Sequence, residues 1–138
     1  MVDSFEYKID SKGRVFIPAS MREELGEVFH VTISDENCLN AYSMESWKRF
    51  LTRVEEMPMR KQPMMRPFFS NAKKCELDAQ GRFVLPQKLR ERIKADKEVT
   101  VVGIGTRVQF WNTETYRAIN EEETKPENLA KVMDELDF

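Results

Sequence analysis

The sequence predicts an α+β, β-rich fold made of two tandem copies of one unit, related by a pseudo-two-fold axis. The first observation is a repeat: Asp10-Ser-Lys-Gly-Arg14 returns 68 residues later as Asp78-Ala-Gln-Gly-Arg82. The second is that each loop runs on through three apolar residues to a proline and then to an Arg–Glu pair at identical spacing. The third is that short alternating segments, typical of strands, alternate with stretches of helical periodicity.

The first half of the unit contains two strands, a tight turn and a helix. Alternating apolar and charged residues over 5–9 predict a half-buried strand. Gly13 marks a turn in which a positive φ costs little only for glycine. Residues 14–17 predict a second short strand, and Pro18 suits the first turn of a helix. Gly26 is expected to end that helix.

The second half of the unit predicts a hairpin followed by an amphipathic helix. Residues 28–34 and 38–42 are expected to form the hairpin, and Ser43 to cap the helix that Pro58 ends. One face of that helix is apolar and consists of Met44, Trp47, Leu51 and Val54. The second copy repeats this order, so each copy has four strands and two helices.

These patterns divide the chain into four segments. We expect a first unit at 5–56, a connecting segment at 57–72, a second unit at 73–120 and an acidic helical tail at 121–138. The connecting segment is rich in methionine and is therefore expected to pack against its surroundings; its methionines are Met57, Met59, Met64 and Met65. One unit alone buries little apolar surface, so the two copies are expected to cover each other.

Composition argues against several classes of protein. No apolar run approaches the length of a membrane helix and no signal sequence is present, which predicts a cytoplasmic protein. Cys38 and Cys75 are expected to be buried thiols, and with the single His30 they suggest no metal site. No phosphate-binding loop or nucleophile motif occurs, so we expect no enzymatic activity, cofactor or small-molecule substrate.

Charge is distributed unevenly along the chain. The formal net charge is −2, but residues 48–90 hold eleven Lys/Arg and four Asp/Glu, whereas residues 112–138 hold three and eight. A basic middle of this kind fits a nucleic-acid partner and also fits an ordinary solvated surface. The tail has an apolar stripe at helical spacing, which could pack on its own domain or on a neighbouring subunit; the stripe is Leu129, Val132, Met133 and Leu136.

The repeated loop has the chemistry of a DNA contact. Arg14 and Arg82 stand beside a glycine turn, and arginine binds a phosphate or a guanine edge through two parallel hydrogen bonds. Asp10 and Asp78 can accept hydrogen bonds from the turn or hold the arginine in place. A purely structural Asp–Arg salt bridge is the competing interpretation. Further candidates for the DNA surface are Lys12, Gln80, Arg22 and Arg90, and the loops are structured by Gly13, Pro18, Gly81 and Pro86.

At these loops the chain resembles the MraZ family, whose units belong to the AbrB-like, swapped-hairpin superfamily. The resemblance extends from about Phe5 to Trp111 and depends on the two Asp-to-Pro motifs, 10–18 and 78–86. It implies tandem swapped-hairpin units that form a barrel, and DNA-facing loops built on Arg14 and Arg82. Lys12 belongs to that surface by position. Gln80 stands in its place in the second copy, so the two loops are expected to contact DNA unequally.

The resemblance also implies a function. It implies a bacterial, nucleoid-associated transcription factor of a division and cell-wall gene cluster, which binds repeated promoter boxes as a closed-ring homo-oligomer. One rival is a protein-interaction module such as an AbrB-like antitoxin, in which the apolar tail binds a protein partner. An enzyme acting on phosphorylated substrates ranks last, since the chain offers no general base for it.

Overall fold

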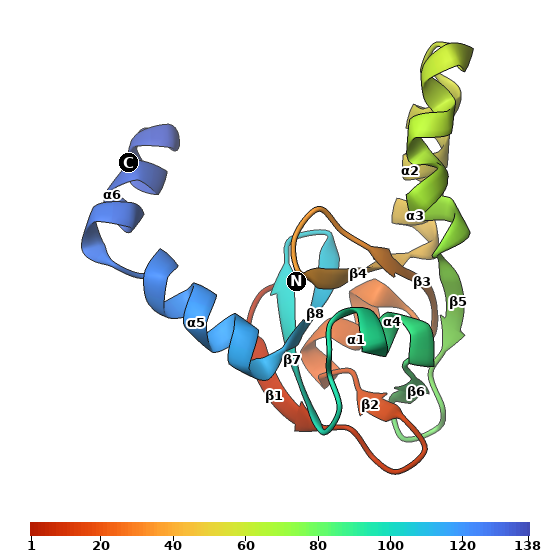
Figure 1. Ribbon diagram of the computed structural model, residues 1–138, viewed down its shortest axis with the longest axis horizontal. Helices are drawn as coiled ribbons and strands as arrows, with labels where there is room; N and C mark the ends of the chain where they lie inside the picture. Colours follow the sequence, from red (N-terminus) through yellow and green to blue (C-terminus); the bar gives the residue numbers. More distant parts are fainter.

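The computed structural model describes residues 1–138 and contains one six-stranded antiparallel sheet and one two-stranded ribbon (Figure 1). The large sheet has the order β1-β7-β8-β4-β3-β5 and leaves β1 and β5 as its edges. Its strands are β1 (Ser4–Lys8), β7 (Glu98–Ile104), β8 (Arg107–Asn112), β4 (Cys38–Ser43), β3 (Val28–Ile33) and β5 (Lys73–Glu76). The ribbon pairs β2 (Arg14–Phe16) with β6 (Arg82–Val84). The predicted α+β, β-rich class is confirmed.

The two copies of the repeat exchange strands. Strand β1 of the first copy pairs with β7 of the second, with Phe5 opposite Val101. In the same way β5 of the second copy pairs with β3 of the first, with Phe29 opposite Cys75. Each copy therefore completes the sheet of the other, as the swapped-hairpin resemblance implies.

Equivalent residues face each other at the pseudo-two-fold axis. Val15 lies opposite Phe83 in the ribbon, and Asn40 lies opposite Gln109 where β4 meets β8. Each pair occupies the same position in the two copies. Both copies contribute to a single core of 20 buried residues, which includes Phe29, Phe83 and Phe110. The Phe83 ring lies 5.1 Å from that of Phe29 and 5.4 Å from that of Phe110.

A short helix follows each strand of the ribbon. These helices are α1 (Ala19–Leu25) and α4 (Gln87–Arg92), and Met21, Leu25 and Leu89 point into the core. Pro18 and Pro86 each stand one residue before the helix as its N-cap, not inside its first turn as expected from sequence. Their carbonyl groups accept from the helical amides, so the proline still opens the helix. Gly26 ends α1 with φ 82°, as predicted.

Each hairpin leads into a helical arm that extends from the sheet (Figure 1). The first arm comprises α2 (Met44–Glu55), the 3₁₀ helix η1 (Met59–Met65) and α3 (Arg66–Ser70), and the second comprises α5 (Thr113–Glu123) and α6 (Pro126–Glu135). Both arms begin with a side-chain cap: Ser43 Oγ accepts from the Ser46 amide, and Asn112 Oδ1 from the Thr115 amide, each at 3.1 Å. No helix combines the length and the apolar character that crossing a bilayer needs.

The two arms expose several apolar side chains. Met59 is 84% exposed and Met64 is 68% exposed, so the expectation that the connecting segment packs through its methionines is wrong for these two. Of the four methionines only Met57 and Met65 are partly covered, and η1 lies against α2. The stripe of the tail is exposed: Leu129, Val132 and Met133 lie on α6, and Leu136 is the C-cap of that helix.

Candidate nucleic-acid interface

The two predicted loops lie at the ends of the β2–β6 ribbon. Alternation along each strand turns Val15 and Phe83 into the core and leaves the neighbouring residues on the outer face. The register places Arg14 opposite Val84 and Phe16 opposite Arg82. The outer face therefore presents two arginines and two apolar side chains in a diagonal arrangement; Phe16 is 40% exposed and Val84 is 56% exposed.

The ribbon continues into both loops through backbone hydrogen bonds. The Ile17 amide donates to the Gly81 carbonyl at 3.0 Å, and the Leu85 amide donates to the Gly13 carbonyl at 2.9 Å. Gly13 has φ 77° and Gly81 has φ 80°, which confirms the predicted glycine turns. Each loop is thus hydrogen-bonded to the strand segment of the other copy, and the two loops belong to one continuous surface.

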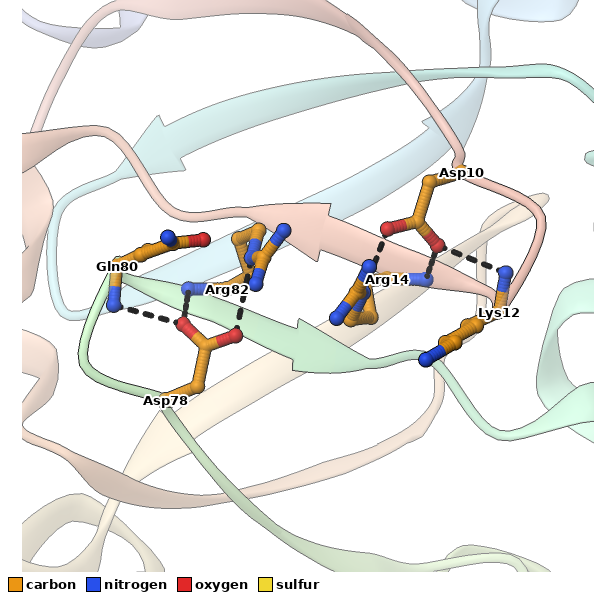
Figure 2. Close-up of polar contacts among 6 residues, drawn as sticks. All are labelled: Asp10, Lys12, Arg14, Asp78, Gln80 and Arg82. Atoms are coloured by element: carbon orange, nitrogen blue, oxygen red, sulfur yellow. Dashed lines mark hydrogen bonds and ion pairs between the residues drawn. The ribbon is translucent and has the colours of Figure 1, made fainter.

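Asp10 organises the first loop through both carboxylate oxygens (Figure 2). Its Oδ1 accepts from the amides of Lys12 and Arg14, each at 2.9 Å. Its Oδ2 accepts from Nε of Arg14 at 2.6 Å. The Arg14 amide, followed by its side chain and the Lys12 amide, lowers the pKa of Asp10 to about 2. The carboxylate therefore stays ionised at neutral pH and fixes the direction of the arginine.

Asp78 repeats this arrangement in the second loop (Figure 2). Its Oδ1 accepts from the amides of Gln80 and Arg82 at 2.9 Å, and its Oδ2 accepts from Nε of Arg82 at 2.9 Å. The Arg82 amide, then that of Gln80, lowers the pKa of Asp78 below its ordinary value. Two loops that differ in sequence at two of five positions thus share one hydrogen-bond pattern.

The structural salt bridge is present and leaves donors of both arginines free. The ion pair expected from the structural interpretation is present in both copies. It uses only Nε of each guanidinium, which has five N–H donors in total. The terminal nitrogens of Arg14 and Arg82 have no hydrogen-bond partner within the chain. Each arginine is therefore held at its inner nitrogen, and its outer nitrogens stay free.

Arg22 and Arg90 lie against the loop of the opposite copy. Arg22 Nε donates to the Ile17 carbonyl at 2.8 Å. A Cβ atom placed on Gly81 would come within 2.5 Å of the same Nε, and one placed on Gly13 would come within 2.8 Å of Nη1 of Arg90. The sequence predicts these arginines near the loops. In the structure the guanidinium group of each one packs against the glycine of the other copy's loop.

Comparison with known proteins identifies the relatives of this chain. A family model described as "MraZ protein, putative antitoxin-like" matches residues 2–66 and again residues 68–137. The chain belongs to the MraZ family. The two matches coincide with the two copies of the repeat, which share the one core.

Curated relatives match most or all of the chain. A protein of Thermoanaerobacter sp. (strain X514) is 39% identical over 142 residues, which cover 100% of this chain and 99% of the relative. One from Desulforamulus reducens is 42% identical over 92% of each chain, and one from Carboxydothermus hydrogenoformans is 45% identical over 81% of this chain and 80% of the relative. All three are named "Transcriptional regulator MraZ".

Two residues that the sequence predicts to contact DNA lie at the edge of the ribbon's outer face in this MraZ-family chain. The side chains of Lys12 and Gln80 are exposed at the two loop tips. Sequence reasoning missed Phe16 and Val84, although strand alternation places both on the same face as the arginines. The guanidinium carbon of Arg82 lies 5.9 Å from the centre of the Phe16 ring, so the aromatic side chain also flanks the arginine.

Other groups of chemical interest lie apart from the ribbon. The His30 ring stacks on Trp47 at 4.6 Å, and burial, with Lys74 nearby, lowers its pKa. Cys38 and Cys75 are buried free thiols, as predicted, and burial raises the pKa of each to about 11. No three His, Cys, Asp or Glu side chains are grouped in a way that could hold a metal ion.

Proposed function

We propose that this chain is a DNA-binding transcriptional regulator that places the outer face of the β2–β6 ribbon in the major groove of double-stranded DNA. The major groove of B-DNA admits a two-stranded β-ribbon. The observation that supports the proposal best is the pair of guanidinium groups on one face, each oriented by a carboxylate and each with free terminal nitrogens. The relatives are named as transcriptional regulators, which agrees with this activity.

The outer face can read bases as well as phosphates. The terminal nitrogens of Arg14 and Arg82 suit the O6 and N7 atoms of guanine, and Phe16 and Val84 suit the methyl groups of thymine. Lys12 adds a phosphate contact at the first loop tip. Gln80 is neutral at the equivalent tip, so the first loop is expected to contribute more to affinity and to its salt dependence.

The DNA target and the oligomeric state are also part of the proposal. We propose that the chain acts in the bacterial nucleoid, on the promoter of a division and cell-wall gene cluster, as a closed-ring homo-oligomer. One ribbon has few phosphate contacts and binds weakly alone. A ring that presents several ribbons gains affinity through effective concentration when promoter boxes recur at matching spacing.

The test is DNA binding by the variant Arg14→Ala/Arg82→Ala. The DNA upstream of the chain's own gene, labelled with a fluorophore, is titrated at several salt concentrations and followed by anisotropy. A good bidentate arginine–guanine contact contributes about 1–3 kcal/mol, so the loss of two is expected to weaken binding about 30-fold or more.

The matched control is Arg60→Ala/Lys61→Ala, which removes the same charge from exposed positions on η1. It is expected to bind almost as the original chain does. Equal affinities for the ribbon variant and the original chain would show that the ribbon is not the DNA surface. Equal weakening in both double variants would show a non-specific charge effect.

A second candidate function is a protein-interaction module of the antitoxin type. The exposed stripe of α6 and the description of the matching family favour it. Deletion of residues 124–138 separates the two functions. If a co-purifying protein is lost while DNA binding stays, the tail binds a protein partner.

A further inference from the structure

The two ends of the β2–β6 ribbon are equivalent in the repeat but differ in the apolar side chain beside the arginine. At the first end Arg14 lies opposite Val84. At the second end Arg82 lies opposite Phe16. The offset of 68 residues equates Phe16 with Val84, so the same position holds an aromatic ring in one copy and a small branched side chain in the other. Both arginines have the same carboxylate anchor, and the strands therefore differ on their outer face in this apolar neighbour.

The ring of Phe16 lies between a second aromatic ring and the arginine. The ring centre of Tyr7 is 5.9 Å from that of Phe16, with the two planes tilted by 42°. On its other side the guanidinium carbon of Arg82 lies 5.9 Å from the Phe16 centre. Cys75 stands at the position of Tyr7 in the second copy, so this row of rings exists in one copy only. The Phe16 ring is thus supported by packing while 40% of it remains exposed.

Arg82 is held in place at two points. Asp78 Oδ2 accepts from its Nε at 2.9 Å, and Phe16 lies within the distance of about 6 Å at which a ring attracts a cation. The Arg82 side chain is 20% exposed, compared with 29% for Arg14. A side chain that is ordered before binding loses less entropy when the complex forms. Arg82 therefore has a more fixed direction than Arg14, and its terminal nitrogens are still free.

The distance between the arginine and the ring fits neighbouring base pairs. Base pairs follow one another at about 3.4 Å along the duplex, so groups 5.9 Å apart reach the same pair or adjacent pairs. The terminal nitrogens of arginine suit O6 and N7 of guanine, and a phenylalanine ring suits the C5 methyl group of a pyrimidine. The ring has no donor or acceptor for the other atoms of the pyrimidine edge. It therefore responds to the methyl group, which thymine and 5-methylcytosine share.

We propose that Arg82 and Phe16 together recognise one base step, a guanine beside a 5-methylpyrimidine, and that this end of the ribbon supplies more of the sequence discrimination than the Arg14 end. The inference rests on the DNA binding proposed above and names the feature that the second end recognises. Lys12 at the first end contributes charge, which attracts DNA of any sequence. Phe16 contributes no charge and distinguishes bases by one methyl group. Methylation of a cytosine beside the guanine is therefore expected to strengthen binding.

The test compares DNA with and without pyrimidine methyl groups. The fragment upstream of the chain's own gene is synthesised once with thymine and once with uracil at every thymine position. Uracil pairs with adenine as thymine does but lacks the C5 methyl group. Both fragments are titrated by fluorescence anisotropy at one salt concentration, and the readout is the ratio of the two dissociation constants for each variant. A change in the fraction of folded protein affects both constants equally and leaves the ratio unaltered.

The original chain is expected to bind the uracil fragment about fourfold more weakly for each methyl contact that is lost. Phe16→Ala is expected to bring the ratio close to one. Val84→Ala, the matched change at the equivalent position, is expected to keep most of the ratio. Met59→Ala removes an apolar side chain that is 84% exposed on η1, away from the ribbon, and is expected to keep all of it.

A second measurement identifies the step itself. Duplexes of random sequence are enriched by binding to the original chain, and the enriched sites are expected to contain guanine beside thymine. Phe16→Ala is expected to keep the guanine and lose the preference for thymine, whereas Arg82→Ala loses the guanine. When that thymine is replaced, the site with 5-methylcytosine is expected to bind the original chain about fourfold more tightly than the site with cytosine. Phe16→Ala is expected to bind these two sites equally.

Three outcomes would overturn the inference. The first is that the original chain binds the thymine and uracil fragments equally. The second is that Phe16→Ala keeps the ratio of the original chain, which would show that the ring does not contact the methyl group. The third is that Val84→Ala lowers the ratio as much as Phe16→Ala does, which would show that the two ends discriminate equally. In each case the result for Arg14→Ala/Arg82→Ala still decides separately whether the ribbon binds DNA, and a chain that binds no DNA would refute both proposals.

Discussion

Replacing Gly81 by alanine tests how the ribbon loops are supported. The backbone of Gly81 has φ 80°, a left-handed conformation that costs an alanine about 1–2 kcal/mol. The new Cβ would also come within 2.5 Å of Nε of Arg22, which donates to the Ile17 carbonyl at 2.8 Å. The guanidinium must therefore move and lose this bond, which adds about 1–2 kcal/mol for a partly exposed charged donor. The expected loss of stability is about 2–4 kcal/mol.

Two other glycines provide matched comparisons. Gly105 has φ 68° and open space around its Cβ direction, so Gly105→Ala is expected to show conformational strain alone, about 1–2 kcal/mol. Gly13→Ala has the same strain and meets Nη1 of Arg90 at 2.8 Å. That nitrogen has no acceptor within the chain and can rotate away, so the cost is expected to stay near that of Gly105→Ala.

The assay is urea-induced unfolding at one fixed protein concentration, because self-association makes stability depend on concentration. A loss for Gly81→Ala no larger than that for Gly105→Ala would refute the reasoning. The double variant Gly81→Ala/Arg22→Ala removes the crowded side chain. It is expected to be less destabilised than the sum of the two single variants, and strict additivity would show that the two positions do not interact.

Two further predictions concern the loop carboxylate and the core. The pKa of Asp10 is lowered from 3.8 to about 2 in the folded chain, so its ionised form stabilises the fold above about pH 4, and this contribution disappears as pH falls through about 2. Urea unfolding of Asp10→Asn and the original chain should therefore differ most at neutral pH and converge between about pH 4 and 2; a difference independent of pH would contradict this. Phe83 is 2% exposed between two other phenylalanine rings, so Phe83→Ala is expected to cost about 3–5 kcal/mol, whereas Val84→Ala, at a 56% exposed neighbour, is expected to stay within about 0.5 kcal/mol in the same assay.

Features governed by neighbouring residues could be predicted from the sequence. The turns could be predicted because glycine is the residue that adopts a positive φ most easily, as Gly13 and Gly81 do. The cap at Ser43 could be predicted because its hydroxyl lies three residues before a helical amide that lacks a backbone acceptor. The hairpins and the amphipathic helix α2 follow from periodicity over fewer than fifteen residues. The Asp–Arg pairs belong to the same class, since both partners lie within five residues.

Features that depend on contact between the copies could not be predicted from local patterns. Alternation over 5–9 identifies a strand but not its partner, which is β7 of the other copy. For the same reason the sequence predicts that Arg22 lies near a loop, but not that this is the Gly81 loop of the other copy. Met59 and Met64 were expected to pack because methionine is apolar, yet η1 lies on an arm with nothing over its outer side. The segment bounds 5–56 and 73–120 stay a prediction about the repeat, because the strand exchange leaves neither unit with a sheet of its own.

The strand exchange also determines when the protein can fold during synthesis. The pairing of Ser4 with Val102 joins residues 98 positions apart, so the first strand to leave the ribosome waits for one of the last. At about 5–20 residues per second this wait is about 5–20 s, far longer than a hairpin needs to form. During that time the first copy exposes the apolar side of its hairpin, and a chain that ends early never covers it. Premature termination therefore yields an aggregation-prone fragment and not a smaller working regulator.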